Sequence, residues 1–161
     1  MIDILMATFN GGSYIERQIL SLLGQTYRDW KLIIHDDGSN DDSLNVIKKY
    51  QQLDPRISLI EDDLKFGDAG KNFMHLLKFS TNEYVIFCDQ DDIWLENKLE
   101  VLYRRITQNS NLSMIGVYSE GYLYDSNRGI GGVIPTLKPD NLQSALFMNS
   151  GIQGCAVLFD S

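Results

Sequence analysis

The sequence predicts an α/β fold in which helices flank a mostly parallel β-sheet. Short apolar runs alternate with longer segments whose apolar residues recur at helical spacing, and this alternation is typical of consecutive βα units. The chain has 161 residues, of which 43% are apolar, so it is long enough to bury a core of its own. We therefore expect residues 1–161 to belong to a single domain.

Four βα units are expected in residues 1–110. Their strands are expected at residues 2–7, 31–35, 57–60 and 84–88. A helix follows each strand, because the apolar residues there recur every three or four positions. These apolar residues are Ile15, Ile19, Leu22 and Leu23 in the first helix, Leu44, Ile47 and Tyr50 in the second, Phe73, Leu76 and Leu77 in the third, and Leu95, Leu99, Leu102 and Ile106 in the fourth. Gly24 and Asp54-Pro55 are typical stop signals of the first two helices, and Asp41 or Asp42 is a typical start of the second.

The pattern changes after Asn111. Strands are expected at residues 114–118 and 122–125, a loop at 129–132, a short amphipathic stretch at 142–148 and a last apolar run from Cys155. This section is not another βα repeat, and the chain ends directly after an apolar run. We therefore expect a chain cut from a longer protein, in which residues 1–110 form one half of the domain and residues 111–161 begin the other.

Acidic residues outnumber basic ones by 22 to 14, which gives a formal net charge of −8. The sequence has no cluster of Lys and Arg, so it lacks the electrostatic footprint of a protein that binds duplex DNA or an anionic membrane. Nucleic acid is therefore not expected as a partner. A nucleotide that is held through a divalent cation is compatible with this charge.

The cysteines and the apolar runs indicate a compartment. Cys88 and Cys155 lie in apolar runs, where cysteine usually behaves as a small buried hydrophobe, and there is no CxxC motif. No apolar run approaches the roughly 20 residues of a membrane span. Residues 1–10 lack the basic start and the long apolar stretch of a signal peptide. We therefore expect a cytoplasmic location.

Polar motifs follow three of the expected strands at their carboxyl ends. The motifs are Thr8-Phe9-Asn10, Asp36-Asp37-Gly38-Ser39 and Asp89-Gln90-Asp91-Asp92. In an open α/β sheet, ligands bind in a crevice outside the carboxyl ends of the strands. We therefore expect the three motifs to meet at one site.

Asp89 and Asp91 are the candidate metal ligands. Two carboxylates one residue apart on a turn can hold a hard cation and leave other positions of that cation open for phosphate oxygens. The alternative is that Asp91 or Asp92 only caps the helix that follows.

Asp37 is the candidate for recognising a base. A carboxylate at a strand end can accept the imide N–H of uracil or thymine, which favours a pyrimidine. Thr8 and Asn10 can add polar contacts to the base or the ribose. The alternative is that both motifs form ordinary turns, with an Asp-Gly turn at Asp37 and a side-chain turn at Thr8 and Asn10.

Four further residues complete the candidates. Lys71 is the basic residue best placed to neutralise a diphosphate if the loop at residues 67–70 folds over the site, and a solvated position is its alternative. Trp94 is expected in the core or in the wall of the crevice, where its ring can stack on a sugar. His35 and His75 are isolated in the sequence, without zinc-binding spacing, and are expected to be structural.

Together, these motifs resemble the inverting family 2 glycosyltransferases of the GT-A fold, a Rossmann-like, mostly parallel sheet flanked by helices. The resemblance rests on motifs in family order, dense over residues 1–110 and looser beyond. They are Thr8-Phe9-Asn10, Gln25-Thr26-Tyr27, Asp36-Asp37-Gly38-Ser39, Gly70-Lys71-Asn72 and the segment FCDQDDIW at residues 87–94. The segment CDQDDIW, with GIQGC at residues 151–155, resembles the bacterial polysaccharide branch of rhamnosyl- and related transferases.

The resemblance implies an activity and a division of roles. The activity is metal-dependent, inverting transfer of a sugar from a UDP- or dTDP-sugar to a hydroxyl of a saccharide or lipid-linked saccharide, in bacterial cell-surface polysaccharide synthesis. The implied nucleotide-binding residues are Thr8, Asn10, Asp36, Asp37, Lys71 and Asp89. Asp91 and Asp89 would hold Mn²⁺ or Mg²⁺, and Asp92 and Trp94 would line the sugar or acceptor side.

The resemblance also divides the chain. Residues 1–110 would form the donor-binding half and residues 111–161 the start of the acceptor-side half. The family's general base lies in a later segment, so no catalytic base is assigned here. Peripheral association of the full-length protein with the inner face of the plasma membrane is compatible with this arrangement.

Two other functions remain open. A sugar-phosphate nucleotidyltransferase would also be a metal-dependent α/β protein, but it would begin with a glycine-rich loop containing Arg and Pro-Lys, which residues 8–17 do not match. A non-catalytic module that binds a nucleotide-sugar is the second alternative.

Overall fold

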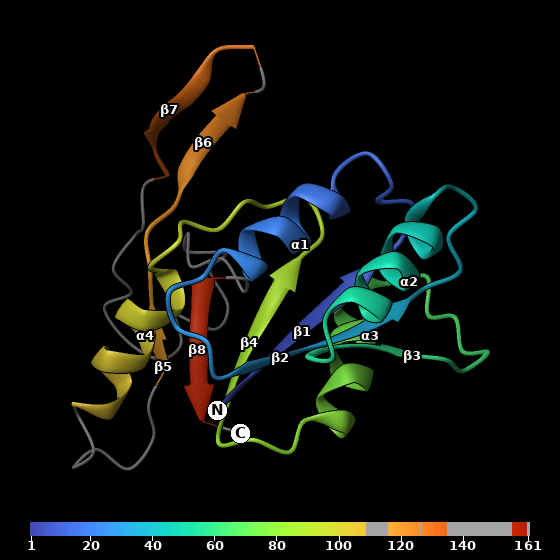
Figure 1. The fold of residues 1–161 in the computed structure, drawn as a ribbon, viewed down its shortest axis with the longest axis horizontal. Helices are drawn as coiled ribbons and strands as arrows, with labels where there is room; N and C mark the ends of the chain where they lie inside the picture. Colours follow the sequence, from blue (N-terminus) through green and yellow to red (C-terminus); the bar gives the residue numbers. More distant parts are fainter. Residues whose placement is uncertain (109–115, 126, 135–155, 161) are drawn as a thin grey trace.

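A computed structural model of the chain describes residues 1–108, 116–125, 127–134 and 156–160. Its centre is a six-stranded sheet with the strand order β3-β2-β1-β4-β8-β5 (Figure 1). The strands of this sheet are β1 (Ile2–Thr8), β2 (Trp30–Asp36), β3 (Ile57–Ile60), β4 (Tyr84–Asp89), β5 (Gly116–Tyr118) and β8 (Val157–Asp160). Strands β1 to β4 are parallel, and β8 is antiparallel to both of its neighbours. The predicted mostly parallel sheet is confirmed.

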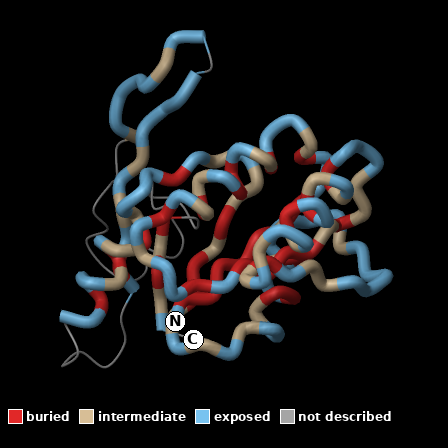
Figure 2. Tube along the Cα trace, viewed as in Figure 1, coloured by how far each residue is buried: buried red, intermediate tan, exposed pale blue. Residues whose placement is uncertain are grey.

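Helices cover both faces of the sheet. Because alternate residues of a strand point to opposite faces, Ile4 and Met6 of β1 belong to one core cluster and Leu5 belongs to another. The first face is covered by α1 (Ile15–Leu23), α2 (Ser43–Leu53) and α4 (Lys98–Thr107). The second face is covered by α3 (Ala69–Leu76) and the short 3₁₀ helix η1 (Leu77–Phe79). In Figure 2 the buried residues accordingly lie along the central strands.

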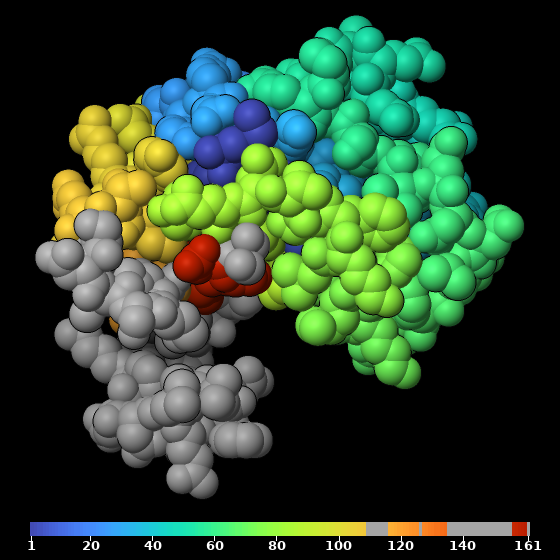
Figure 3. All heavy atoms as spheres, turned by 90° about the horizontal axis from the view of Figure 1, so that it is seen from below, coloured from blue at the N-terminus to red at the C-terminus, as the bar shows by residue number. Residues whose placement is uncertain are grey.

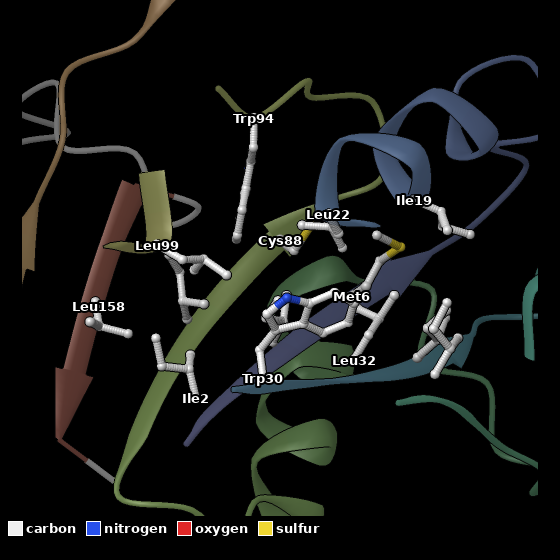
Figure 4. Close-up of a cluster of buried hydrophobic side chains, with 14 of the residues drawn as sticks. Ile2, Met6, Ile19, Leu22, Trp30, Leu32, Cys88, Trp94, Leu99 and Leu158 are labelled. Carbon is white, nitrogen blue, oxygen red and sulfur yellow. The ribbon is translucent and has the colours of Figure 1, made fainter. Parts of the chain in front are cut away.

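The larger core cluster lies between the sheet and the first helical layer. Figure 4 shows Trp30 among side chains of β1, β2 and α1, and Trp94 reaching into the same cluster from above the end of β4. Cys88 is fully buried there as a free thiol, and burial raises its pKa. This placement confirms the prediction for Cys88. Cys155 lies outside the described residues.

The fourth predicted helix begins later than expected. Leu95 was expected on its buried face, but α4 begins at Lys98 and Leu95 is 57% exposed. The physical reason is Gln25, whose amide N–H₂ donates to the Leu95 carbonyl at 2.8 Å, while its side-chain oxygen accepts from the Leu99 N–H at 3.0 Å. This buried amide holds the segment before α4 in a non-helical path.

The section after residue 115 differs from expectation at one point. The predicted loop at residues 129–132 is wrong, because β7 (Gly129–Val133) pairs with β6 (Tyr122–Asp125) in an antiparallel hairpin. Pairing with β6 supplies the backbone hydrogen bonds that make this glycine-containing segment a strand, and Figure 2 shows the hairpin to be largely exposed. The amphipathic stretch expected at 142–148 lies outside the described residues.

The last apolar run forms β8 within the main sheet. Tyr84 of β4 pairs with Ile2 on one side and with Asp160 on the other, so the first strand and β8 flank β4. Figure 3 shows part of β8, in red, at the surface on the face of the molecule at the amino ends of the parallel strands, where Asp160 is exposed while Leu158 is buried. Among the described residues, no helix has the length and apolar character needed to span a membrane.

Candidate functional site

The three polar motifs meet at the carboxyl edge of the sheet. The strand order reverses between β1 and β4, since β2 and β3 lie on one side of β1 and β4 lies on the other. In register, Thr8 pairs with Asp36, and Ala7 pairs with Asp89. The reversal point of an open α/β sheet is where its ligand crevice forms. A cavity of about 550 Å³ lies here, within the range of small-molecule sites.

Charged and aromatic side chains line this cavity. Its acidic residues are Asp37, Asp68, Asp89 and Asp91, and Lys65 is the basic residue among the described residues that line it. Thr8, Phe9, Asn72, Phe73 and Gln90 also line it. Phe9 is 51% exposed, so its ring is available to a ligand. The cavity thus joins a strongly acidic wall to an accessible aromatic ring.

Gln90 joins the ends of β1 and β4. Its side-chain oxygen accepts from the Thr8 hydroxyl at 2.8 Å and from the Phe9 N–H at 3.0 Å, and its amide N–H₂ donates to the Phe9 carbonyl at 3.0 Å. The predicted nucleotide-binding residue Thr8 therefore lines the cavity with its hydroxyl proton already used. Its oxygen can still accept a hydrogen bond. Gln90 had no predicted role, although it lies within the acidic motif at residues 89–92.

Asn10 and Asp36 shape the loops around the cavity and do not line it. Asn10 has a left-handed backbone, with φ of 49°, and its side-chain oxygen accepts from the Asn40 N–H at 2.9 Å. Asp36 accepts from the N–H groups of Gly38 and Ser39 and from the Ser39 hydroxyl. For these two residues the geometry fits the alternative expectation, in which they form turns.

Asp37 is buried and lines the cavity. Both of its carboxylate oxygens accept backbone hydrogen bonds, one from the Phe66 N–H and the other from the Gly67 N–H at 2.8 Å. Each carboxylate oxygen has a second acceptor site, so Asp37 keeps the capacity to accept a ligand N–H. The same side chain therefore fixes the loop after β3 against the end of β2.

Lys65, and not Lys71, is the lysine that reaches the cavity. Lys71 is exposed on α3 and is not among the lining residues, while its backbone N–H donates to the Asp68 carboxylate that caps α3. The side chain of Lys65 passes over Gly38, where a Cβ would lie 2.7 Å from Nζ. Gly38 has φ of 87°, a left-handed conformation that favours glycine. Sequence reasoning missed Lys65, because it lies in no motif.

The residues of the acidic segment that begins at the end of β4 differ in position. Asp89 and Asp91 line the cavity, as the metal prediction requires, and Asp91 is exposed. Asp92 and Trp94 are not among the lining residues. Trp94 is 4% exposed and packs in the core, where Lys98 Nζ lies 3.9 Å from the centre of its ring. Trp94 therefore forms core rather than cavity wall.

His35 and His75 are not isolated from each other. They lie with Asp62 in one cluster beside α3, so the expectation that they are isolated is wrong, while the expectation that they are structural stays a prediction. The chain separates His35 from Asp62 by 27 residues and Asp62 from His75 by 13. Residue spacing therefore carried no signal of the cluster, which depends on β2, the loop after β3 and α3 folding against one another.

The sheet with its reversal point and the acidic cavity are typical of an α/β protein that binds a ligand at the carboxyl edge of its sheet. The family model described as Glycosyl transferase family 2 matches residues 3–151, and the chain belongs to this family. The predicted family is confirmed.

Bacterial sugar transferases are among its relatives. It is 40% identical over 99 residues to the dTDP-rhamnosyl transferase RfbG of Shigella flexneri, across 59% of this chain and 34% of RfbG. It is 30% identical over 160 residues to the UDP-Glc:alpha-D-GlcNAc-diphosphoundecaprenol beta-1,3-glucosyltransferase WfgD of Escherichia coli, across 99% of this chain and 60% of WfgD. The chain thus spans less than two thirds of the length of each of these relatives.

Solved structures share the fold. Residues 1–349 of TarS from S. aureus, in complex with UDP, match with a TM-score of 0.69 at 21% identity, over 87% of this chain and 39% of that one. The mannosyltransferase PcManGT from Pyrobaculum calidifontis, in complex with GDP-Man and Mn²⁺, matches with a TM-score of 0.69 at 15% identity, over 98% of this chain and 44% of that one. At these identities the likeness concerns the fold, and the predicted GT-A architecture is confirmed.

Proposed function

We propose that this chain forms the donor-binding part of a glycosyltransferase. The enzyme would transfer a sugar from a UDP- or dTDP-sugar to an acceptor hydroxyl in bacterial cell-surface polysaccharide synthesis, with inversion and with a divalent metal. The observation that carries the proposal is the cavity at the β1/β4 reversal point, with Asp37 on one side and Asp89 and Asp91 on the other. Residues 1–110 act as the donor-binding half in this proposal, and residues 111–161 begin the acceptor-side half.

Charge supports a metal in this site. A diphosphate that enters the cavity meets Asp37, Asp68, Asp89 and Asp91, and Lys65 offers it a cationic group. Carboxylate oxygens are the ligands that Mg²⁺ and Mn²⁺ prefer, and Asp89 and Asp91 can supply them. When bound, such an ion offsets the negative charge that develops on a departing nucleoside diphosphate. Lys65 provides the second positive charge at the cavity wall.

The base and the ribose would lie between the ends of β1 and β2. Asp37 accepts the imide N–H of a pyrimidine in this arrangement, and the exposed ring of Phe9 can stack on a base or a sugar. Thr8 adds a hydroxyl oxygen as an acceptor for a ribose hydroxyl. The relatives described as dTDP-rhamnosyl and UDP-glucose transferases support a pyrimidine donor.

Calorimetry tests the proposal. UDP, dTDP, GDP and ADP are titrated into the protein, each with and without Mn²⁺. We expect UDP or dTDP to bind in the presence of Mn²⁺ and the two purine nucleotides to bind much more weakly. Equal affinity for all four nucleotides would contradict the role of Asp37, and UDP or dTDP binding that is independent of metal would contradict the metal site.

The variant Asp91→Asn separates a metal ligand from a structural residue. Because Asp91 is exposed, the thermal unfolding temperature of the variant should stay close to that of the wild type. The metal-dependent part of its nucleotide affinity should disappear. Asp63→Asn is the matched control, since it removes an exposed carboxylate outside the cavity. Unfolding of Asp91→Asn, or unchanged metal dependence, would exclude Asp91 as a ligand.

A further inference from the structure

His35, Asp62 and His75 form a compact cluster of potential metal ligands. His35 Nε2 lies 3.1 Å from Asp62 Oδ1, and His75 Nε2 lies 2.8 Å from Asp62 Oδ2. One ligand atom from each of the three residues lies within 4.8 Å of the others. The side chains of His35 and His75 are 1% and 9% exposed, whereas that of Asp62 is 28% exposed. The cluster is therefore buried on its imidazole side and open to water on its carboxylate side.

Asn72 determines which nitrogen of His35 carries a proton. Asn72 is 1% exposed, its side-chain oxygen lies 2.8 Å from His35 Nδ1, and its amide N–H₂ points to the His35 carbonyl at 3.4 Å. An amide held this way presents an acceptor to the ring, so Nδ1 of His35 is the protonated nitrogen. In this tautomer Nε2 faces the Asp62 carboxylate at 3.1 Å, and a proton or a metal ion between the two would satisfy both atoms.

We propose that His35 Nε2, His75 Nε2 and the Asp62 carboxylate bind a Zn²⁺ ion. Two imidazoles and one carboxylate are a donor set that suits Zn²⁺, whereas Mg²⁺ and Ca²⁺ prefer oxygen ligands. Tetrahedral zinc with bonds of about 2.0–2.1 Å places its ligand atoms about 3.3 Å apart. The ligand atoms of this cluster lie within 4.8 Å of one another, so small side-chain adjustments would bring them around one ion. The exposed side of Asp62 leaves room for water as the fourth ligand.

Asn72 fits the proposal as an outer partner of the zinc ligand His35. Metal-bound histidines usually donate their second ring N–H to an oxygen, which fixes the ring and its tautomer. The Asn72 oxygen accepts in this way from His35 Nδ1. A buried amide in this position is therefore a second feature, independent of the cluster, that prepares His35 to bind a cation.

The site would stabilise one wall of the cavity. Asp62 and Lys65 belong to the same loop, and the ring of Phe66 in that loop lies 5.1 Å from His75 and 5.6 Å from His35. Bound zinc would join β2, this loop and α3, and so hold Lys65 in place beside the cavity. His35, Asp62 and His75 do not line the cavity, so this site is separate from Asp89 and Asp91 and does not depend on the proposed transferase function.

Zinc titration of chelator-treated protein tests the proposal. We expect one equivalent of Zn²⁺ to bind and to raise the thermal unfolding temperature, and we expect Asp91→Asn to retain both effects. His75→Phe, a ring that fits beside Phe66 and Phe79, and Asp62→Asn should each weaken binding at least about tenfold. Absence of zinc binding, or undiminished affinity in both variants, would overturn the proposal.

X-ray absorption at the zinc edge tests the site in the wild-type protein, so it does not depend on the folding of a variant. The wild-type protein loaded with one equivalent should show two imidazole ligands, and a ligand shell without imidazole would overturn the site. Nitrogen NMR of His35 gives the last comparison. Two protonated ring nitrogens that persist with excess Zn²⁺ would show that a proton, and not zinc, lies between His35 and Asp62.

Discussion

The carboxylate of Asp37 accepts a 2.8 Å hydrogen bond from the backbone N–H of Gly67, which lies 30 residues later in the chain. The neighbouring N–H of Phe66 donates to the other oxygen of the same carboxylate. A residue that the sequence marks for base recognition therefore also anchors the loop that brings Lys65 to the cavity. The proposed base recognition and the local stability of this loop would therefore be coupled at this side chain.

Asp37→Asn should uncouple the loop after β3 from the end of β2. An asparagine turns one acceptor into a donor that faces a backbone N–H, so we expect the free energy of unfolding to fall by about 1–3 kcal/mol. Urea unfolding measures this loss. Asp63→Asn changes an exposed carboxylate of the same loop and should alter stability by no more than about 0.5 kcal/mol. Equal stability of Asp37→Asn and the wild type would show that the anchor contributes nothing.

Gly11 and Gln90 should behave as an energetically coupled pair. A Cβ at Gly11 would overlap the side-chain oxygen of Gln90, which would have to leave its hydrogen bonds to Thr8 and Phe9. Gly11→Ala and Gln90→Ala should therefore each cost about 1–2 kcal/mol of unfolding free energy.

The double variant of Gly11 and Gln90 should cost less than the sum of the single variants, by at least about 0.5 kcal/mol in a double-mutant cycle. Gly24→Ala is the control, because the nearest atom to its Cβ is 3.5 Å away. Its effect should add to that of Gln90→Ala. If the effects of Gly11→Ala and Gln90→Ala on the unfolding free energy also add, residue 11 and Gln90 are not energetically coupled.

Lys65 should matter more than Lys71 for nucleotide binding. Lys65 lines the cavity and Lys71 does not, so Lys65→Ala should weaken the affinity for UDP or dTDP with Mn²⁺ by about tenfold, the loss expected for a hydrogen bond to a charged group. Lys71→Ala is the matched control, because it removes the same charge from the exposed surface of α3. A larger effect of Lys71→Ala in calorimetry would restore Lys71 as the diphosphate partner.

Asp3 should make stability depend on pH in the acid range. Burial opposes its charged form, but hydrogen bonds from Asn82, Thr81 and Ser80 outweigh burial and lower the pKa of Asp3. Because the folded pKa lies below the unfolded one of about 3.9, the stabilisation is present above that pH. It is lost as the pH falls through the folded pKa.

Asp3→Asn measures this contribution. The asparagine would turn an N–H₂ group toward hydrogen-bond donors, so we expect the free energy of unfolding at pH 7 to fall by about 1–3 kcal/mol. Below about pH 4, the stability of this variant should decline less than that of the wild type. Urea unfolding at neutral and acidic pH measures both effects. Asp63→Asn should lose stability at acidic pH as much as the wild type does. If Asp3→Asn also loses as much, carboxylates other than Asp3 cause the acid sensitivity.

Sequence periodicity predicted the βα part of the fold well. The strand at residues 57–60 has the expected bounds, and β1, β2 and β4 extend only one residue beyond prediction at one or both ends. Apolar patterns determine these elements locally, since burial on both faces of a parallel sheet requires near-continuous apolar strands. The hairpin of β6 and β7 was only half predicted, because pairing between strands and not local composition makes residues 129–133 extended.

The mostly parallel sheet, the family and the acidic motifs at the strand ends could be predicted from the sequence, because they follow from patterns within a few neighbouring residues. Which side chains share a space could not be predicted, because it depends on tertiary packing. That packing put Lys65 rather than Lys71 at the cavity, placed Trp94 in the core, and joined His35 to His75 through Asp62. These relationships depend on how loops and helices far apart in the chain pack against the same sheet, and residue spacing holds no record of that packing.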